Sequence, residues 1–353
     1  MSFSPLERLE RTALSIASKN GAVLDLTNSS LSIDLQLSIT EHLTVNGSDI
    51  VVVGPSDPSL IQRISESVGS QGRMIVNDPN YSAENCKILS SGYGDFRTKA
   101  EFITNYLIAN TLSDVAAYQQ LEQALSEQRL KDPVIQNDTI DSVFLGDTLN
   151  LGLKDTSQEI LSEAFRVLRR GGKLLLTIVL TDEELTHNEL PLTTNNHHIQ
   201  FIPQEKEIFK LLETAGFYGM SIVWRETLPY KVVAGRELRR FVIEAYKGKQ
   251  GVCLDQGHAV IYKGPWSEVV DDDGHRFPRG ERMAVCAKTY EIMTKAPYSE
   301  HFIGVLPYLE IPLDQAPLFD CNTPLVRDPA VTKGIKSVFD TAGGSCDPST
   351  GCC

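Results

Sequence analysis

The chain has 353 residues, which is enough for two domains, and 41% of them are hydrophobic, so a substantial core can form. The 33 basic and 46 acidic residues give a formal net charge of −13 without a concentrated basic face, which argues against nucleic acid and anionic membranes as partners. No apolar run approaches the roughly 20 residues of a membrane helix. Seven cysteines without a signal peptide predict a cytoplasmic protein whose thiols act as ligands or nucleophiles.

The first part of the chain predicts a helical lead followed by a βαβ unit. Residues 1–45 form the lead, with a helix over residues 6–18. The β-branched run Ile50–Val53 is then broken by Gly54-Pro55, apolar residues at helical spacing follow, and a second strand ends at Asp78. An acidic residue about 20 positions beyond the first turn is typical of a site that binds the ribose of a nucleoside-type cofactor.

The middle of the chain predicts half of a crossover unit in a doubly wound α/β sheet. Thr156 and Glu159 have the spacing of a capping box, and the helix that they begin is expected to end at Gly171-Gly172. The nearly continuous apolar run Leu174–Leu180 is typical of a strand that is buried on both faces.

The remaining segments complete the sheet and lead into a second domain. We expect helices over residues 102–112 and 116–130, strands over 140–147 and 239–248, and a helix followed by a strand over 208–224. The junction KGKQG places a domain boundary near residue 248, so the sheet domain spans residues 46–247. Prolines punctuate residues 248–353, which predicts a smaller α+β module with a cysteine-rich tail.

Two stretches make the chain resemble the arsenite methyltransferase family. These are EAFRVLRRGGKLLLT (163–177) and YKGPWSEVVDDDGHRFPRGERMAVCAKT (262–289), and Cys253 also matches a family position. The resemblance implies a Rossmann-like class I methyltransferase sheet and an S-adenosylmethionine (SAM) cofactor. It places Gly54, Ser56 and Asp78 at the cofactor, and a small-molecule or metalloid substrate, possibly thiol-conjugated, at the same site.

The chain departs from that family in its first loop and in its cysteines. Where the family has strand-Gly-Cys-Gly-x-Gly, this chain has Gly54-Pro55-Ser56-Asp57-Pro58, and the two prolines remove amide donors. Asp147 stands where an arsenic-binding cysteine would be, although Asn150 and Leu151 are retained. The family's third cysteine should fall near residues 190–205, where no cysteine is present.

Two groups of residues are the candidates for chemistry. Asp147 is expected at the carboxyl end of a strand, where it is either a general base or a cap of the following turn. Cys286, Cys346, Cys352 and Cys353 are the candidate metal ligands, because trivalent arsenic and other soft ions prefer thiolates. The competing interpretation is a mobile tail whose thiols have no specific role. Similarly, Asp271–Asp273 with His275 is either a cation site or a solvated turn.

Three functions therefore compete. The first is a SAM-dependent methyltransferase that acts on trivalent arsenic or on a thiol-associated substrate, and this is the prediction. The second is a catalytically degenerate homologue that sequesters a metalloid or soft metal through its C-terminal cysteines. The third is a methyltransferase for a small organic molecule, with Asp147 as base and the C-terminal module as lid.

Overall fold

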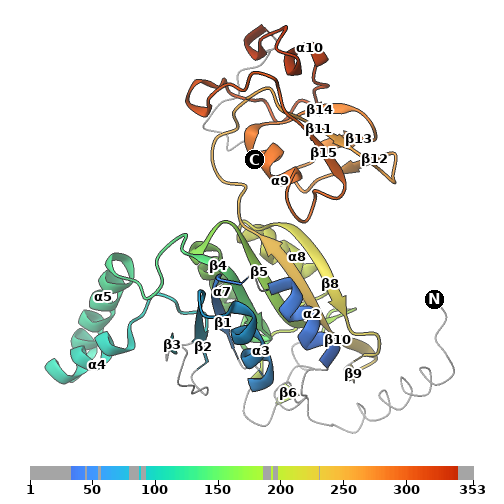
Figure 1. The fold of residues 1–353 in the computed structure, drawn as a ribbon. Helices are drawn as coiled ribbons and strands as arrows, with labels where there is room; N and C mark the ends of the chain where they lie inside the picture. Colours follow the sequence, from blue (N-terminus) through green and yellow to red (C-terminus); the bar gives the residue numbers. More distant parts are fainter. Residues whose placement is uncertain are drawn as a thin grey trace. The chain divides into compact units, whose positions relative to one another are not determined.

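The structure is a computed structural model that describes residues 33–43, 46–54, 57–78, 87–88, 93–185, 192–193, 198–229 and 231–340 (Figure 1). The chain divides into two compact units, residues 1–247 and residues 248–353. The predicted helix over residues 6–18 lies outside the described residues, as do Ser56, Cys346, Cys352 and Cys353. None of the described helices is both long and apolar enough to cross a membrane.

The first unit is built on one sheet, with the strand order β3-β2-β1-β4-β5-β10-β8 and with β9 paired to β10. The strands from β3 to β5 pair in parallel, and β10 runs antiparallel between β5 and β8. A parallel sheet with one antiparallel strand near its edge confirms the α/β class. The strands are β1 (Asp49–Val53), β2 (Arg73–Asn77), β3 (Lys87–Ile88), β4 (Ile140–Gly146), β5 (Leu168–Thr181), β8 (Tyr218–Arg225), β9 (Lys231–Val233) and β10 (Arg236–Tyr246), with β6 (Leu192–Thr193) and β7 (His198–Ile199) as a separate pair.

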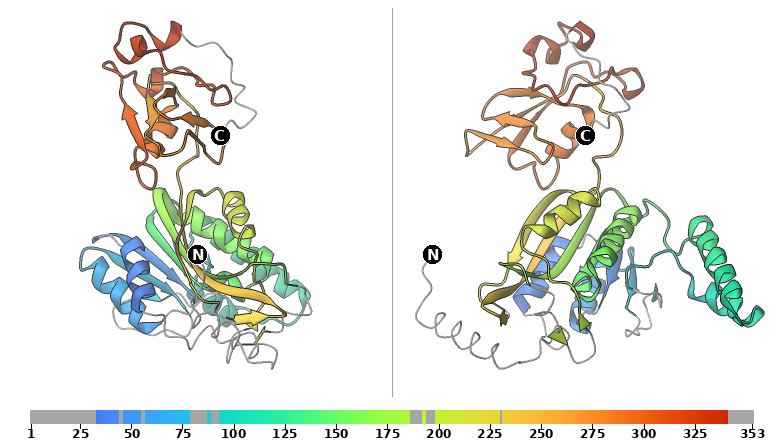
Figure 2. Two further views of the ribbon diagram at one scale, coloured as in Figure 1. Left: turned by 90° about the vertical axis from the view of Figure 1, so that its right-hand side faces the viewer. Right: turned by 180° about the vertical axis from the view of Figure 1, so that it is seen from behind.

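Helices cover both faces of this sheet (Figure 2). Successive side chains of β1 alternate between the two faces, so that Val51 and Val53 join one core cluster while Ile50 and Val52 join another. The first cluster includes α7 and α8, and the second includes α2 and α3. The helices are α2 (Ile33–Leu43), α3 (Pro58–Val68), α4 (Ala100–Ala109), α5 (Val115–Lys131), α6 (Thr148–Leu151), α7 (Lys154–Val167) and α8 (Glu207–Thr214).

The boundaries of α7 differ from those predicted. The helix begins at Lys154 after Leu153, so Thr156 lies inside the first turn and forms no capping box. The hydroxyl of Ser157 instead donates to the carbonyls of Leu149 and Leu153. At the other end the helix stops at Val167 rather than at the glycine pair, because Leu168 already pairs with Ile140 of β4. The predicted buried strand is confirmed within β5.

The second unit is a small α+β module. Strands β11 (Ala259–Tyr262), β14 (Arg282–Ala284) and β15 (Phe302–Val305) form one antiparallel sheet, and β12 (Glu268–Val270) pairs with β13 (Arg276–Pro278). Its longest described helix, α9 (Ala287–Met293), has only seven residues, as the prolines predicted. The short helices η2 (Leu313–Gln315), α10 (Pro329–Thr332) and η3 (Val338–Asp340) complete the module.

Candidate functional site

The sheet order reverses between β1 and β4, and ligands of open α/β sheets bind outside the carboxyl ends of strands at such a point. Gly54 directly follows β1 there, with a φ of +93°. A Cβ added to it would lie 2.2 Å from Oγ1 of Thr148 and 2.8 Å from the carbonyl oxygen of Gly146. The Thr148 hydroxyl also donates to the carbonyl of Val53 at 3.0 Å. Only glycine therefore allows the ends of β1 and β4 to approach this closely.

Asp78 directly follows β2, the neighbour of β1, and only 5% of its surface is exposed. The residue before it, Asn77, fixes this end of the strand. Its backbone carbonyl accepts from the amide of Gly54 at 3.1 Å, and its Oδ1 accepts from the amide of Gly94 at 2.6 Å. Asp78, the candidate residue for binding the ribose, thus lies at the end of the strand that pairs with β1, as the βαβ pattern predicted.

Of the two prolines after β1, Pro58 is compatible with a cofactor site, whereas Pro55 lies outside the described residues. Pro58 occupies the first turn of α3, where its missing N–H would have had no helical partner in any case. Asp57 caps the helix, and its Oδ1 accepts from the amide of Ser59 at 2.8 Å. Because a carboxylate of the chain already sits at this helix start, the turn suits a nucleoside cofactor without phosphates better than a dinucleotide.

Asp147, the candidate base, follows β4 in a left-handed conformation with φ of 53°. Its amide donates to the carbonyl and hydroxyl oxygens of Thr177, both at 3.0 Å. Its Oδ2 accepts from Nη2 of Arg240 at 3.0 Å, and both side chains are buried. Oδ1 is buried as well and has no hydrogen-bond partner among the described residues. Oδ1 is therefore the Asp147 atom that remains for a ligand.

Arg240 and Glu226 belong to this corner of the sheet, and the sequence reasoning missed both. The amide of Arg240 donates to Oε2 of Glu226 at 3.2 Å. Burial raises the pKa of the Glu226 carboxyl, and Arg240 and Arg239 partly oppose that rise, while Asp147 adds to it. The signal available was the pair of arginines at the start of RRFVIEAY, since charges inside a central strand are rarely buried without partners.

Asn150 has a structural role. Its Nδ2 donates to the carbonyls of Val179 and Phe201 at 2.9 and 3.0 Å, and its Oδ1 accepts from the amide of Val179 at 2.9 Å. These bonds fasten α6 to the end of β5, so the side chain has little capacity left for a ligand.

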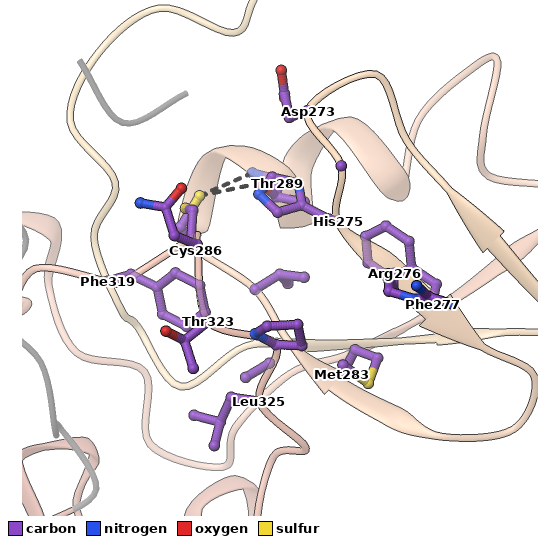
Figure 3. Close-up of a pocket in the computed structure, with 16 residues that line it drawn as sticks. Asp273, His275, Arg276, Phe277, Met283, Cys286, Thr289, Phe319, Thr323 and Leu325 are labelled. Atoms are coloured by element: carbon purple, nitrogen blue, oxygen red, sulfur yellow. Dashed lines mark hydrogen bonds between the residues drawn. The ribbon is translucent and has the colours of Figure 1, made fainter. Parts of the chain in front are cut away.

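In the second unit, Cys286 lies beside two other cysteines, Cys253 and Cys321. Its Sγ contacts Oγ1 of Thr289 at 3.2 Å (Figure 3). The acidic stretch forms a turn: Oδ2 of Asp271 pairs with Nδ1 of His275 at 2.8 Å, and Asp273 pairs with Lys249 at 2.6 Å. Burial raises the pKa of Asp271, but the hydrogen bonds and charge of His275 outweigh burial and lower it overall.

Comparison with known proteins gives matches to one domain family and to solved methyltransferases. A family described as a domain of unknown function (DUF8838) matches residues 249–337. No curated protein matches the sequence. The chain is similar to an arsenic(III) S-adenosylmethionine methyltransferase from Chlamydomonas reinhardtii, with 15% identity, a TM-score of 0.42, and coverage of 86% of this chain and 97% of that one.

Two further structures give lower scores. The YcgJ protein of Bacillus subtilis has 11% identity and a TM-score of 0.40, with 61% of this chain and 98% of that chain covered. Human N-acetylserotonin methyltransferase in complex with SAM has 13% identity and a TM-score of 0.35, with 61% and 52% covered. These values are too low to transfer any residue's role to this chain. Its own sheet order, with β10 antiparallel between β5 and β8, is a Rossmann-like α/β arrangement.

Proposed function

We propose that the chain is a SAM-dependent methyltransferase for a small molecule, with trivalent arsenic or a thiol-associated compound as the methyl acceptor. The observation that carries the proposal is the buried carboxylate of Asp78 beside the Gly54 turn, at the point where the sheet order reverses. When bound, SAM supplies an electrophilic methyl group on a sulfonium sulfur. Asp78 would accept hydrogen bonds from the ribose hydroxyls, and Gly54, which allows the ends of β1 and β4 to approach closely, would shape the adjacent turn.

The charges at the carboxyl ends of β1, β2 and β4 are consistent with a cationic cofactor. Asp57 precedes α3, Asp78 follows β2 and Asp147 follows β4, and Arg240 is the cation paired with Asp147. A sulfonium gains from nearby carboxylates, whereas the phosphates of a dinucleotide are repelled by them. Methyl transfer from a sulfonium mainly requires an aligned and desolvated nucleophile, so few acid or base groups are needed. Oδ1 of Asp147 could then orient the acceptor.

Calorimetry of the full chain with SAM tests the cofactor. Hydrogen bonds to a charged group contribute about 1.5–3 kcal/mol, so Asp78→Asn should weaken SAM binding by about 10–100-fold. The matched control is Asp49→Asn at the opposite end of β1, where the carboxylate pairs with Arg73. That variant should bind SAM as the unchanged chain does. No heat with SAM, or equal weakening in both variants, would rule out the proposed cofactor site.

The acceptor is tested separately with labelled SAM. The full chain is incubated with arsenite and glutathione, with glutathione alone, and with small organic thiols and amines. Methylated arsenic in the first mixture alone supports the metalloid, and label in a thiol or amine product assigns an organic acceptor. SAM binding without any labelled product would contradict the enzymatic function while leaving the cofactor site intact.

A further inference from the structure

Three cysteines of the second unit come together from three separate segments of the chain. The Sγ atoms of Cys253, Cys286 and Cys321 all lie within 4.8 Å of one another. They are buried, with exposed fractions of 5%, 0% and 7%, and none of the three forms a disulfide. Buried cysteines commonly serve as small apolar residues. Three that converge on a single point from distant segments call for a more specific explanation.

Backbone hydrogen bonds hold these segments in place. The amide of Phe319 donates to the carbonyl of Cys253 at 2.9 Å, and the amide of Ala287 donates to the carbonyl of Leu254 at 2.9 Å. The segment around Cys253 is thereby bonded to the segments that carry both other cysteines. The cluster does not depend on flexible side chains alone, so the three sulfur atoms are arranged before any ligand binds.

A buried ion pair also holds the segment that follows Cys253. Arg327, with 1% of its surface exposed, donates to both carboxylate oxygens of Asp255 at 2.7 and 3.0 Å. Its Nε also donates to the carbonyl of His258 at 3.1 Å. Nζ of Lys288, in α9, donates to the carbonyls of Lys249 and Gly251, just before Cys253. Such support is typical of a site whose ligands must keep fixed positions.

The spacing and surroundings fit a single ion. Thiolates bound to zinc at about 2.3 Å in a tetrahedral site lie about 3.8 Å apart, so the observed limit of 4.8 Å requires only a small closure. Cys286 and Cys321 also line a cavity of about 110 Å³, together with Thr289, Asn322 and His275 (Figure 3). This volume holds several water molecules and provides a path by which an ion could reach the sulfur atoms.

We propose that Cys253, Cys286 and Cys321 together bind one soft, thiolate-preferring ion. Two ions share this chemistry. Arsenous acid would form three As–S bonds and lose three As–O bonds, with each thiol proton leaving in a water molecule. Zinc would displace the three protons into solvent and take a fourth ligand from the cavity. Neither reaction changes an oxidation state.

Charge distinguishes the two ions. Three thiolates neutralise trivalent arsenic, which suits a buried site without a further ligand. The complex of zinc with the same three thiolates would carry a net charge of −1. For zinc, His275 is a candidate fourth ligand because it lines the same cavity as Cys286 and Cys321, and its pairing with Asp271 is the usual support of a zinc-bound histidine. The site does not depend on methyl transfer, since all its residues belong to the second unit.

The test uses the full chain with Cys346, Cys352 and Cys353 replaced by serine, so that the tail contributes no thiol. This reduced, metal-free protein is titrated with arsenite and, separately, with zinc and with cobalt(II) as a spectroscopic probe. One equivalent of arsenite or zinc should bind, and cobalt should give thiolate charge-transfer absorption. If this protein binds neither arsenite nor zinc, the proposal is wrong, and that result has no bearing on SAM binding.

Single substitutions then assign the ligands. In the tail-free chain, Cys321→Ser and Cys253→Ser should each weaken binding by about a hundredfold or more. Cys321→Ala provides a second variant if the serine disturbs folding, and circular dichroism together with the fluorescence of Trp266, which belongs to the second unit, reports whether each variant is folded. A folded variant that still binds the ion as tightly as the tail-free chain would refute the assignment. Tighter binding of arsenite than of zinc identifies a metalloid site, and the reverse identifies a zinc site.

Discussion

The buried pair between Asp147 and Arg240 makes a sharp prediction about stability. Both side chains are at most 10% exposed, and Nη2 of Arg240 lies 3.0 Å from Oδ2 of Asp147. Asp147→Asn keeps the shape of the side chain and tolerates the φ of 53°, so it removes only the charge. The variant breaks the buried ion pair of Arg240 with Asp147, at a cost of about 3–5 kcal/mol in the free energy of unfolding. Arg240→Met should cost a similar amount because it strands Asp147 instead.

Urea unfolding followed by tryptophan fluorescence measures this cost. The chain has two tryptophans, Trp224 in β8 and Trp266 in the second unit, so the Trp266→Phe background reports on the first unit alone. With a slope of about 3 kcal/mol per molar, the midpoint should fall by about 1 M or more in each single variant.

The double variant provides the control for that experiment. The double variant removes both members of the ion pair, so its loss should be clearly smaller than the sum of the two single losses. If each single variant loses less than about 1 kcal/mol, solvent screens the pair, and its proposed role in fixing Asp147 is wrong.

Three further variants test the site and the fold. Gly54→Ala should lower the free energy of unfolding by about 2–4 kcal/mol, because the added Cβ would collide with Thr148. Gly171→Ala should lower it by less, because its added Cβ would meet nothing within 4 Å. Asn150→Leu should cost about 3 kcal/mol or more in urea unfolding, since it leaves buried backbone groups of β5 without partners. Burial lowers the pKa of His258, and the charge and hydrogen bond of Glu310 partly oppose this shift. Below about pH 6.5, the usual pKa of histidine, the unfolded chain therefore binds more protons at this residue than the folded chain does. The free energy of unfolding should then fall as the pH decreases. That loss, measured by urea unfolding at two pH values, should be smaller in His258→Gln.

Apolar runs were sufficient to predict most strands of the sheet, although β3 and β9 were missed. The β-branched run that became β1 and the apolar run inside β5 are buried on both faces, and such strands have no competing interpretation as amphipathic helices. Helix ends were predicted less well. Thr156 and Glu159 matched a capping box, yet the hydrogen bonds of Ser157 and the pairing of Leu168 with β4 determine where α7 begins and ends. Those contacts come from tertiary structure, which local spacing does not encode.

The site was predicted in part for the same reason. Gly54 and Asp78 belong to one βαβ unit, so their neighbourhood follows from local order along the chain. Arg240 reaches Asp147 only because β10 inserts between β5 and β8, and the three cysteines of the second unit meet only through its loops. The prediction that grouped Cys286 with the tail cysteines relied on the preference of soft ions for thiolates, and the tail cysteines lie outside the described residues. The structure places Cys286 with Cys253 and Cys321.

The backbone of Asp147 connects the stability of the first unit to its function. A non-glycine residue at φ of 53° costs about 1–2 kcal/mol, and the bonds from its amide to Thr177 together with the Arg240 pair hold it there. Those contacts use the amide and one carboxylate oxygen, and they leave Oδ1 buried at the carboxyl end of β4. Leaving a buried oxygen without a partner is costly, so we expect a hydrogen-bond donor at this position, either a water molecule or the proposed methyl acceptor. The same arrangement would make Asp147→Asn weaken the binding of an acceptor that donates to this oxygen, even after the loss of stability is taken into account.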